Sequence, residues 1–298
     1  MKDVLSEMNV SLFKPRKDQC DVCLAYTNGH LPENEYEVHQ AEKKKARDEK
    51  SKDKLRALEG ECHVFTMDVQ AVKLSPMTKA NALYYRTKLC NHNFTIYNLA
   101  TSDATCNWFD ETVSDGSAST FAAFLVHYLE SNFLGKGDNR PIIIYSDGCT
   151  AQNRNVIMSN ALLSLAEKCD VEIIQKYLTK GHTQMECDSV HSTIESALKN
   201  RDIYLPSDYH RIVQEARKRN PYEVFVPTFD FFRDYGYKSL LKHTSIHPGR
   251  SVGNPVFVQL KAIKYTSKGI SYKLQFDEEY RLLPQRPKNI DLAHPEFP

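Results

Sequence analysis

The segment CHVFTMDVQAVKL, residues 62–74, decides the fold. It is a run of β-forming residues that are apolar on both alternating faces, which is typical of a central strand in a sheet covered on both sides. Asp68 lies in the middle of this run. A carboxylate at such a position costs several kcal/mol unless it is paired or bound to a metal. The segment therefore predicts a central strand that carries a functional acid.

The elements that follow alternate between strands and helices. Aromatic and β-branched residues broken by Asn-rich turns predict an antiparallel pair of strands beside the first one. Ser117 or Ser119 can cap the next helix. The predicted elements after the first strand are an antiparallel pair in 81–109, helices at 117–133, 154–169 and 185–200, and strands at 141–146 and 170–178. The order β, β-hairpin, α, β, α, β, α indicates an α/β protein with a mixed sheet flanked by helices.

Four segments follow from the composition along the chain. Residues 1–40 hold a C-x-x-C pair, and residues 41–60 mix both charge signs without Gly or Pro, which predicts a solvated linker helix. Residues 61–218 form the α/β core. Residues 219–298 are Pro- and aromatic-rich, and the stretches VFVQLKAIKY and SYKLQF predict strands of a small β-rich appendage.

Acidic residues are expected to meet at one edge of the predicted sheet. Asp147 ends the strand PIIIYSD, and ligands gather at the carboxyl ends of neighbouring strands in open α/β sheets, so Asp68 and Asp147 should face one another. Two close carboxylates repel unless a cation lies between them, which is how Mg²⁺ sites are built. These two residues therefore predict a divalent-cation site. Read singly, Asp147 could instead open a turn before Gly148.

The last helix is expected to supply a third acid. Its apolar stripe consists of Cys187, Val190, Ile194 and Leu198. Asp188 and Glu195, seven residues apart, share one flank of this stripe, whereas Glu186 points to the far side. Asp188 is the preferred third ligand and Glu195 the reserve. The alternative for Asp188 alone is an interaction with the helix dipole.

Cys20 and Cys23 begin a candidate zinc site. His30 and His39 follow them and complete a set of four zinc-competent side chains. Cys62 or His63 could replace His30 if the charged helix folds back, and an unmetallated surface turn is the alternative for the pair. A redox role is disfavoured, because no thioredoxin-like βαβ unit surrounds the motif.

Composition excludes several classes of protein. The 298 residues carry a net charge of only +1, so any contact with nucleic acid depends on local basic patches, such as residues 201–220 or Lys261, Lys264 and Lys273. Such residues are also typical of an ordinary solvated face. Eight cysteines are too few for a disulfide scaffold, and no apolar run is long enough for a membrane span or a signal peptide. We therefore expect an intracellular protein without a membrane partner.

Two blocks of this sequence resemble a known family. YSDGCTAQNRN at 145–155, followed by KGHTQMECDSVHSTIE at 180–195, is similar to the catalytic text of eukaryotic transposon-derived proteins with a ribonuclease-H-like DDE/DDD core. The resemblance extends to FKPRKDQCDVC at 13–23 and to the charged segment after it, and it fades after about residue 200. Such a core is an α/β mixed sheet flanked by helices.

The resemblance implies roles for individual residues. Asp68, Asp147 and Asp188 match the three catalytic acids and would hold two Mg²⁺ or Mn²⁺ ions, and Glu195 matches a further acid of the same helix. Gln152 and Asn153 would orient the second acid or contact a phosphate, although a polar helix N-terminus explains them equally well. His182 would lie near the catalytic metals, although a lone histidine in a turn is more often structural.

The resemblance also implies a function. It predicts a nuclear transposase that nicks DNA and transfers the new 3′ end to another DNA, with a homodimer as the candidate assembly. One alternative is a domesticated, inactive module that binds DNA or protein, and another is a nuclease without strand transfer. Transposases of this kind usually carry a DNA-recognition module ahead of the core, and only about twenty residues precede Cys20, so we expect a fragment or a repurposed copy.

Overall fold

The computed structural model describes residues 20–84, 86–285 and 296–298. Part of the predicted N-terminal segment, including the stretch FKPRKDQ, lies outside these residues. The helices are α2 Asp21–Thr27, α3 Glu33–Leu58, α4 Asn81–Tyr84, α5 Ala118–Asn132, α6 Val156–Cys169, α7 Glu186–Leu198 and α8 Pro206–Glu215. None of these described helices combines the length and the apolar character that crossing a bilayer requires.

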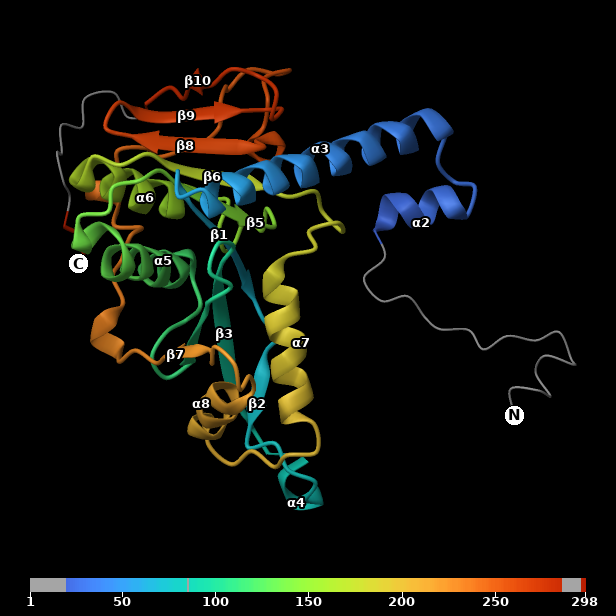
Figure 1. The fold of residues 1–298 in the computed structure, drawn as a ribbon, viewed down its shortest axis with the longest axis vertical. Coiled ribbons are helices and arrows are strands. Elements are labelled where there is room, and N and C mark those ends of the chain that lie inside the picture. Colours follow the sequence, from blue (N-terminus) through green and yellow to red (C-terminus); the bar gives the residue numbers. More distant parts are fainter. Residues whose placement is uncertain (1–19, 85, 286–295) are drawn as a thin grey trace, which may run out of the picture.

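The described strands form one mixed sheet (Figure 1). They are β1 His63–Val69, β2 Lys73–Ser75, β3 Leu89–Asn98, β4 Ala104–Asp110, β5 Ile142–Ser146, β6 Ile173–Tyr177, β7 Glu223–Phe225, β8 Ala262–Thr266, β9 Gly269–Lys273 and β10 Arg281–Leu282. The order across the sheet is β10-β9-β8-β6-β5-β1-β3-β4-β7, with β2 paired to β3. The predicted α/β architecture with a mixed sheet flanked by helices is confirmed.

Strand β1 lies at the centre of the sheet, as its apolar sequence predicts. It pairs antiparallel with β3, where Asp68 lies opposite Thr95, and parallel with β5, where Thr66 lies opposite Tyr145. Strand β6 continues the parallel half. The strands predicted in the C-terminal β-rich part are present as β8 and β9, and β8 pairs antiparallel with β6, so they extend the same sheet. The edge of β6 thus gains a partner in place of solvent.

Alternation along the strands divides the core into two faces. Phe65, Met67, Ile142 and Ile144 pack with the apolar residues of α5 and α6. Val64, Ile143 and Tyr145 lie in the cluster that includes residues of α3 and the start of α7. Side chains in a strand point alternately to the two faces, so Asp68, which shares the parity of Val64, points to the face of α3 and α7.

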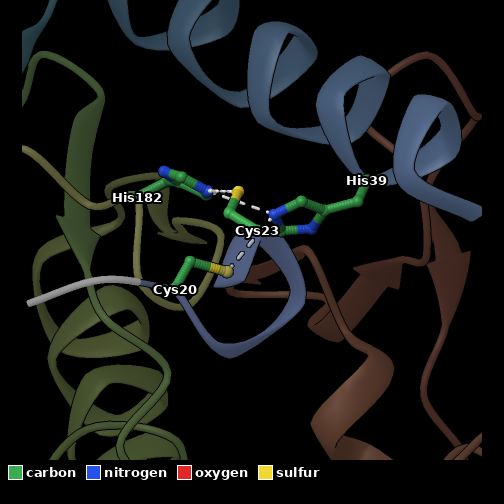
Figure 2. Close-up of side chains that lie close together, drawn as sticks. All are labelled: Cys20, Cys23, His39 and His182. Atoms are coloured by element: carbon green, nitrogen blue, oxygen red, sulfur yellow. Dashed lines mark hydrogen bonds between the residues drawn. The ribbon is translucent and has the colours of Figure 1, made fainter. Parts of the chain in front are cut away.

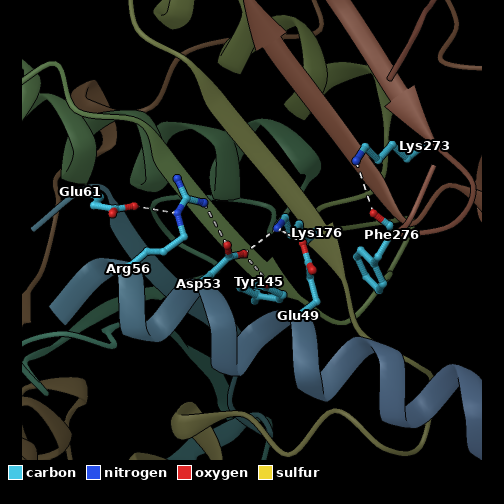
Figure 3. A network of polar contacts seen from close by, with 8 residues as sticks. All are labelled: Glu49, Asp53, Arg56, Glu61, Tyr145, Lys176, Lys273 and Phe276. Carbon is cyan, nitrogen blue, oxygen red and sulfur yellow. Dashed lines mark hydrogen bonds and ion pairs between the residues drawn. The ribbon is translucent and has the colours of Figure 1, made fainter. Parts of the chain in front are cut away.

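Helix α3 is not the solvated linker that its charge pattern predicts. It lies across the sheet, and three of its own residues are buried: Ala46, Asp53 and Ala57. Figure 3 shows the polar contacts that attach it: Lys176 of β6, which is 6% exposed, pairs with Asp53 at 2.6 Å and also with Glu49. The hydroxyl of Tyr145 donates a hydrogen bond to Asp53 at 2.6 Å. Glu49 and Asp53, which belong to a charge pattern typical of a solvated helix, are therefore partners of a buried lysine.

Replacing Lys176 with methionine should destabilise the protein by about 3–5 kcal/mol, the usual cost of leaving a buried charge without its partner. Asp53 is 1% exposed and would keep only Tyr145 and Arg56 as partners. Urea unfolding measures the loss. Lys45→Met is the matched control. Lys45, on α3, pairs with Asp277 at an exposed site, and this pair should contribute less than about 1 kcal/mol to the free energy of unfolding. Equal effects of the two substitutions would contradict the role of Lys176.

Candidate functional site

Asp68 and Asp147 line one cavity of about 860 Å³. Asp68 lies near the C-terminal end of β1, and Asp147 directly follows the last residue of β5. The two strands are parallel neighbours, so their carboxyl ends lie at the same edge of the sheet. The structure thus brings together the two acids that the sequence paired.

The charges of three acids meet at Asp68. Burial, and then the negative charges of Asp147 and Asp188, raise the pKa of the Asp68 carboxyl to about 7, against the opposing effect of a hydrogen bond from the Val69 backbone. A half-buried carboxylate surrounded by like charge favours either a proton or a bound cation. The site therefore has the electrostatics of a cation-binding group.

Asp147 is held in place by its own loop. Its Oδ1 accepts hydrogen bonds from the Cys149 backbone N–H at 3.1 Å and from Asn153 Nδ2 at 3.0 Å. Asn153 is buried, and its amide therefore orients this carboxylate. Gln152 is half-buried, and its side chain has no hydrogen bond to any residue that the structure describes.

Helix α7 presents its acids to different partners. The predicted stripe is confirmed, because Cys187, Val190, Ile194 and Leu198 are its buried residues. Asp188 Oδ2 accepts a hydrogen bond from the Met185 backbone N–H at 2.9 Å, so Asp188 caps the helix while its charge acts on Asp68. Glu195 accepts a hydrogen bond from Gln70 at 2.9 Å and pairs with Lys73. Of the two candidates, Asp188 is the one that acts on Asp68.

A second group of side chains lies beside the acids. Figure 2 shows Cys20, Cys23, His39 and His182 pointing toward one another. Cys20 Sγ lies 3.3 Å from His39 Nε2, and Cys23 Sγ lies 3.2 Å from His182 Nε2. The two histidine Nε2 atoms are 3.1 Å apart, and all four ligand atoms lie within 4.8 Å of one another. This cluster could hold a metal ion such as zinc.

The composition of the cluster corrects one predicted ligand. His30 follows α2, is exposed, and does not belong to the cluster; His182, from the turn between β6 and α7, takes the fourth place. His63 instead contacts Asp138 at 2.9 Å, and Cys62 is buried in the core under α3. The sequence placed His182 near the acids and missed its partners, because they lie more than 140 residues away along the chain.

The cluster and the acids share one cavity. Cys20 and His39 line it together with Asp68 and Asp147. Gly181, with φ of +74°, brings the turn against Cys20, and a Cβ atom at Gly181 would lie only 2.8 Å from the Cys20 Cβ atom. Burial, and then the positive charges of Lys43, His39 and Arg47, lower the pKa of His182, which favours its neutral, metal-binding form. An ion in the cluster would link the turn that contains His182, which precedes Asp188, to α2 and α3.

Comparison of the chain with protein-family models and with curated proteins finds no match. The function is therefore argued from the geometry of the site.

Proposed function

We propose that the chain is a metal-dependent polynucleotidyl transferase or nuclease of the transposase type, with Asp68, Asp147 and Asp188 as its metal ligands. The observation that carries this proposal is that Asp68 and Asp147 line one cavity at the carboxyl ends of two parallel strands, where the charge of Asp188 also acts on Asp68. The substrate would be DNA and the compartment the nucleus, in keeping with the resemblance of residues 145–155 and 180–195 to transposon-derived proteins.

The arrangement of the sheet supports a ribonuclease-H-like core. Strands β1, β3 and β4 form an antiparallel set, and β5 and β6 run parallel to β1 on its other side. Along the chain, α5 follows β4, α6 follows β5 and α7 follows β6. This is the element order predicted from the sequence. A β-rich extension and the docked helix α3 are additions to that core.

The donor set suits hard divalent cations. Asp68 and Asp147 offer carboxylate oxygens within one cavity, and oxygen ligands are those that Mg²⁺ and Mn²⁺ prefer. Burial, and then the negative charge of Asp147, raise the pKa of Asp68, and a bound cation would offset both effects. Ions held here would lower the pKa of an attacking water or hydroxyl and stabilise the charge on the leaving oxygen.

The reaction is a phosphodiester hydrolysis followed by transfer. Water adds its oxygen to phosphorus, the bond to the bridging 3′ oxygen breaks, and that oxygen takes a proton, which leaves a 3′-hydroxyl and a 5′-phosphate. The new 3′-hydroxyl then loses its proton and attacks a phosphodiester of a second DNA, the bond from that phosphorus to its own 3′ oxygen breaks, and this oxygen takes a proton and leaves as a 3′-hydroxyl. In both steps the protein holds the acids in position. Asn153 and the Cys149 backbone orient Asp147, and β1 carries Asp68.

The Cys20, Cys23, His39 and His182 cluster is proposed to hold structural zinc. The bond lengths of a tetrahedral zinc site imply separations of about 3.3–3.8 Å between its ligand atoms. The observed contacts of 3.1–3.3 Å between these atoms are close to that range. Four protein ligands leave no open position, which is typical of structural and not catalytic zinc.

One observation favours the second candidate, a module that binds without turnover. Asp188 is exposed, and one of its oxygens already caps α7, which leaves less of this carboxylate for a metal. Such a module would keep the cavity and the zinc cluster and would lack cleavage. The experiment below separates the two.

Supercoiled plasmid incubated with the protein and Mn²⁺ should be nicked, and the ends should carry 3′-hydroxyl and 5′-phosphate groups. Asp147→Asn should lower the rate at least about a hundredfold, the loss typical of removing one charge-stabilising group. Glu195→Gln is the matched control, because Glu195 is engaged with Gln70 and Lys73. Folded wild-type protein that nicks neither plasmid nor DNA bearing the ends of its own element would contradict the enzyme and favour the binding module.

A further inference from the structure

Arg154 is a buried arginine in the wall of the same cavity. It is 8% exposed and lies two residues before α6. Its guanidinium stacks over the Tyr177 ring, with Cζ 4.1 Å from the ring centroid, and Nη1 donates a hydrogen bond to the Val258 carbonyl. The charge is therefore held rigidly between β6 and the C-terminal part of the chain.

The guanidinium has donors to spare. Within the described residues, Arg154 forms no ion pair, and neither Nε nor Nη2 has a hydrogen-bond partner; the Nε atom is fully buried. Arginine N–H groups of this kind pair with phosphate or carboxylate oxygens. No acid of the described residues forms an ion pair with this buried charge, so an anionic ligand would offset the cost of keeping it.

Gly148 provides the space in which the guanidinium lies. A Cβ atom at this position would be 2.1 Å from Arg154 Nη2 and 2.4 Å from Cζ, far inside contact distance. The glycine of the SDG motif is therefore required by Arg154 and not by its own backbone angles. Burial lowers the pKa of the Arg154 guanidinium, and the negative charge of Asp147, directly before Gly148, is among the influences that oppose this shift, which indicates that acid and arginine are close.

We propose that Arg154 binds a non-bridging oxygen of the DNA phosphodiester that lies against Asp68 and Asp147. The inference rests on the proposed function and adds to it the residue that holds the anionic substrate. The acids would hold the cations, whereas Arg154, which lies beside Gly148 in the same cavity, would offset the charge of the phosphate. The N-terminus of α6, which follows Arg154, adds positive potential at the same place.

Fluorescence polarisation with a labelled duplex oligonucleotide, in Ca²⁺ to prevent cleavage, tests the proposal. Arg154→Gln should weaken binding about tenfold and lower the slope of log affinity against log salt by about one, as expected for one lost phosphate contact. Arg154→Lys should lose less, because it keeps the charge. Gly148→Ala should resemble Arg154→Gln, because it displaces the guanidinium. Lys168→Gln, which removes an exposed charge in the last turn of α6 that is paired with Glu130, is the control and should bind as the wild type does.

The outcomes separate this inference from the function beneath it. Wild-type binding that is unchanged in Arg154→Gln and Gly148→Ala, with an unchanged salt slope, overturns the role of Arg154 and leaves the nuclease proposal standing. A wild-type protein that binds no duplex at all overturns the proposed function itself. If all three variants lose the folded state in thermal unfolding, Arg154 is a structural residue and the inference fails.

Discussion

Replacing His182 with alanine should remove zinc from the protein, whereas replacing His30 with alanine should leave the zinc content unchanged. His182 Nε2 lies 3.2 Å from Cys23 Sγ and 3.1 Å from His39 Nε2, and His30 is exposed outside the cluster. A closed four-ligand site loses most of its affinity with one ligand. Structural zinc contributes about 10–16 kcal/mol to the folding of zinc-finger peptides, so the effect should be large.

Elemental analysis of protein dialysed against metal-free buffer measures the zinc, with one ion per chain expected for wild type and for His30→Ala. Hydrogen exchange locates the consequence. It should rise in α2 and in the turn before α7, while α3 stays attached through Lys176 and its acidic partners. Zinc retained in His182→Ala and lost in His30→Ala would restore the ligand set suggested by the sequence and refute the cluster.

Replacing Asp68 with asparagine should stabilise the metal-free protein and abolish its response to Mn²⁺. The pKa of Asp68 is raised from 3.8 to about 7, so the folded state binds a proton more tightly than the unfolded state does. The contribution of Asp68 to wild-type stability must then fall as the pH rises from about 4 to about 7 and stay level above that range. Asp68→Asn lacks this fall, and its advantage at pH 8 should be about 2–4 kcal/mol.

Urea unfolding at pH 4 and at pH 8 measures the difference, and repeating it with Mn²⁺ tests the cation site. Mn²⁺ should raise the stability of the wild type, because a ligand that binds the folded state stabilises it, and should leave Asp68→Asn unchanged. Glu195→Gln serves as the control and should respond to Mn²⁺ as the wild type does. A response of Asp68→Asn to Mn²⁺ equal to that of the wild type would exclude Asp68 as a ligand.

Local patterns in the sequence were sufficient for most of the core. The apolar run around Asp68 predicts a central strand, and the stripe from Cys187 to Leu198 predicts the buried face of α7; both are confirmed. These predictions succeed because alternation and helical periodicity report which side chains face the core within one element. The meeting of Asp68 and Asp147 follows from the order of the strands.

Contacts across long stretches of chain were not predictable in this way. Helix α3 has the charge pattern of a solvated helix, and only the position of Lys176 in β6 shows that its acids are buried partners. The sequence of β8 carries no sign that this strand pairs with the edge of β6. Which element covers which edge of the sheet depends on the free energy of the whole folded chain, and the periodicity of one segment does not report that free energy.

The sequence by itself determined the mixed α/β sheet, the central strand with its acid, and the zinc-competent Cys20 and Cys23. Only the tertiary structure decided that His182 and not His30 joins them, and that Arg154 lines the cavity of Asp68 and Asp147. The physical reason is one of range. Strand and helix patterns come from neighbours a few residues apart, whereas a site requires side chains from distant segments to converge within a few ångströms, and that convergence is set by the packing of the whole core.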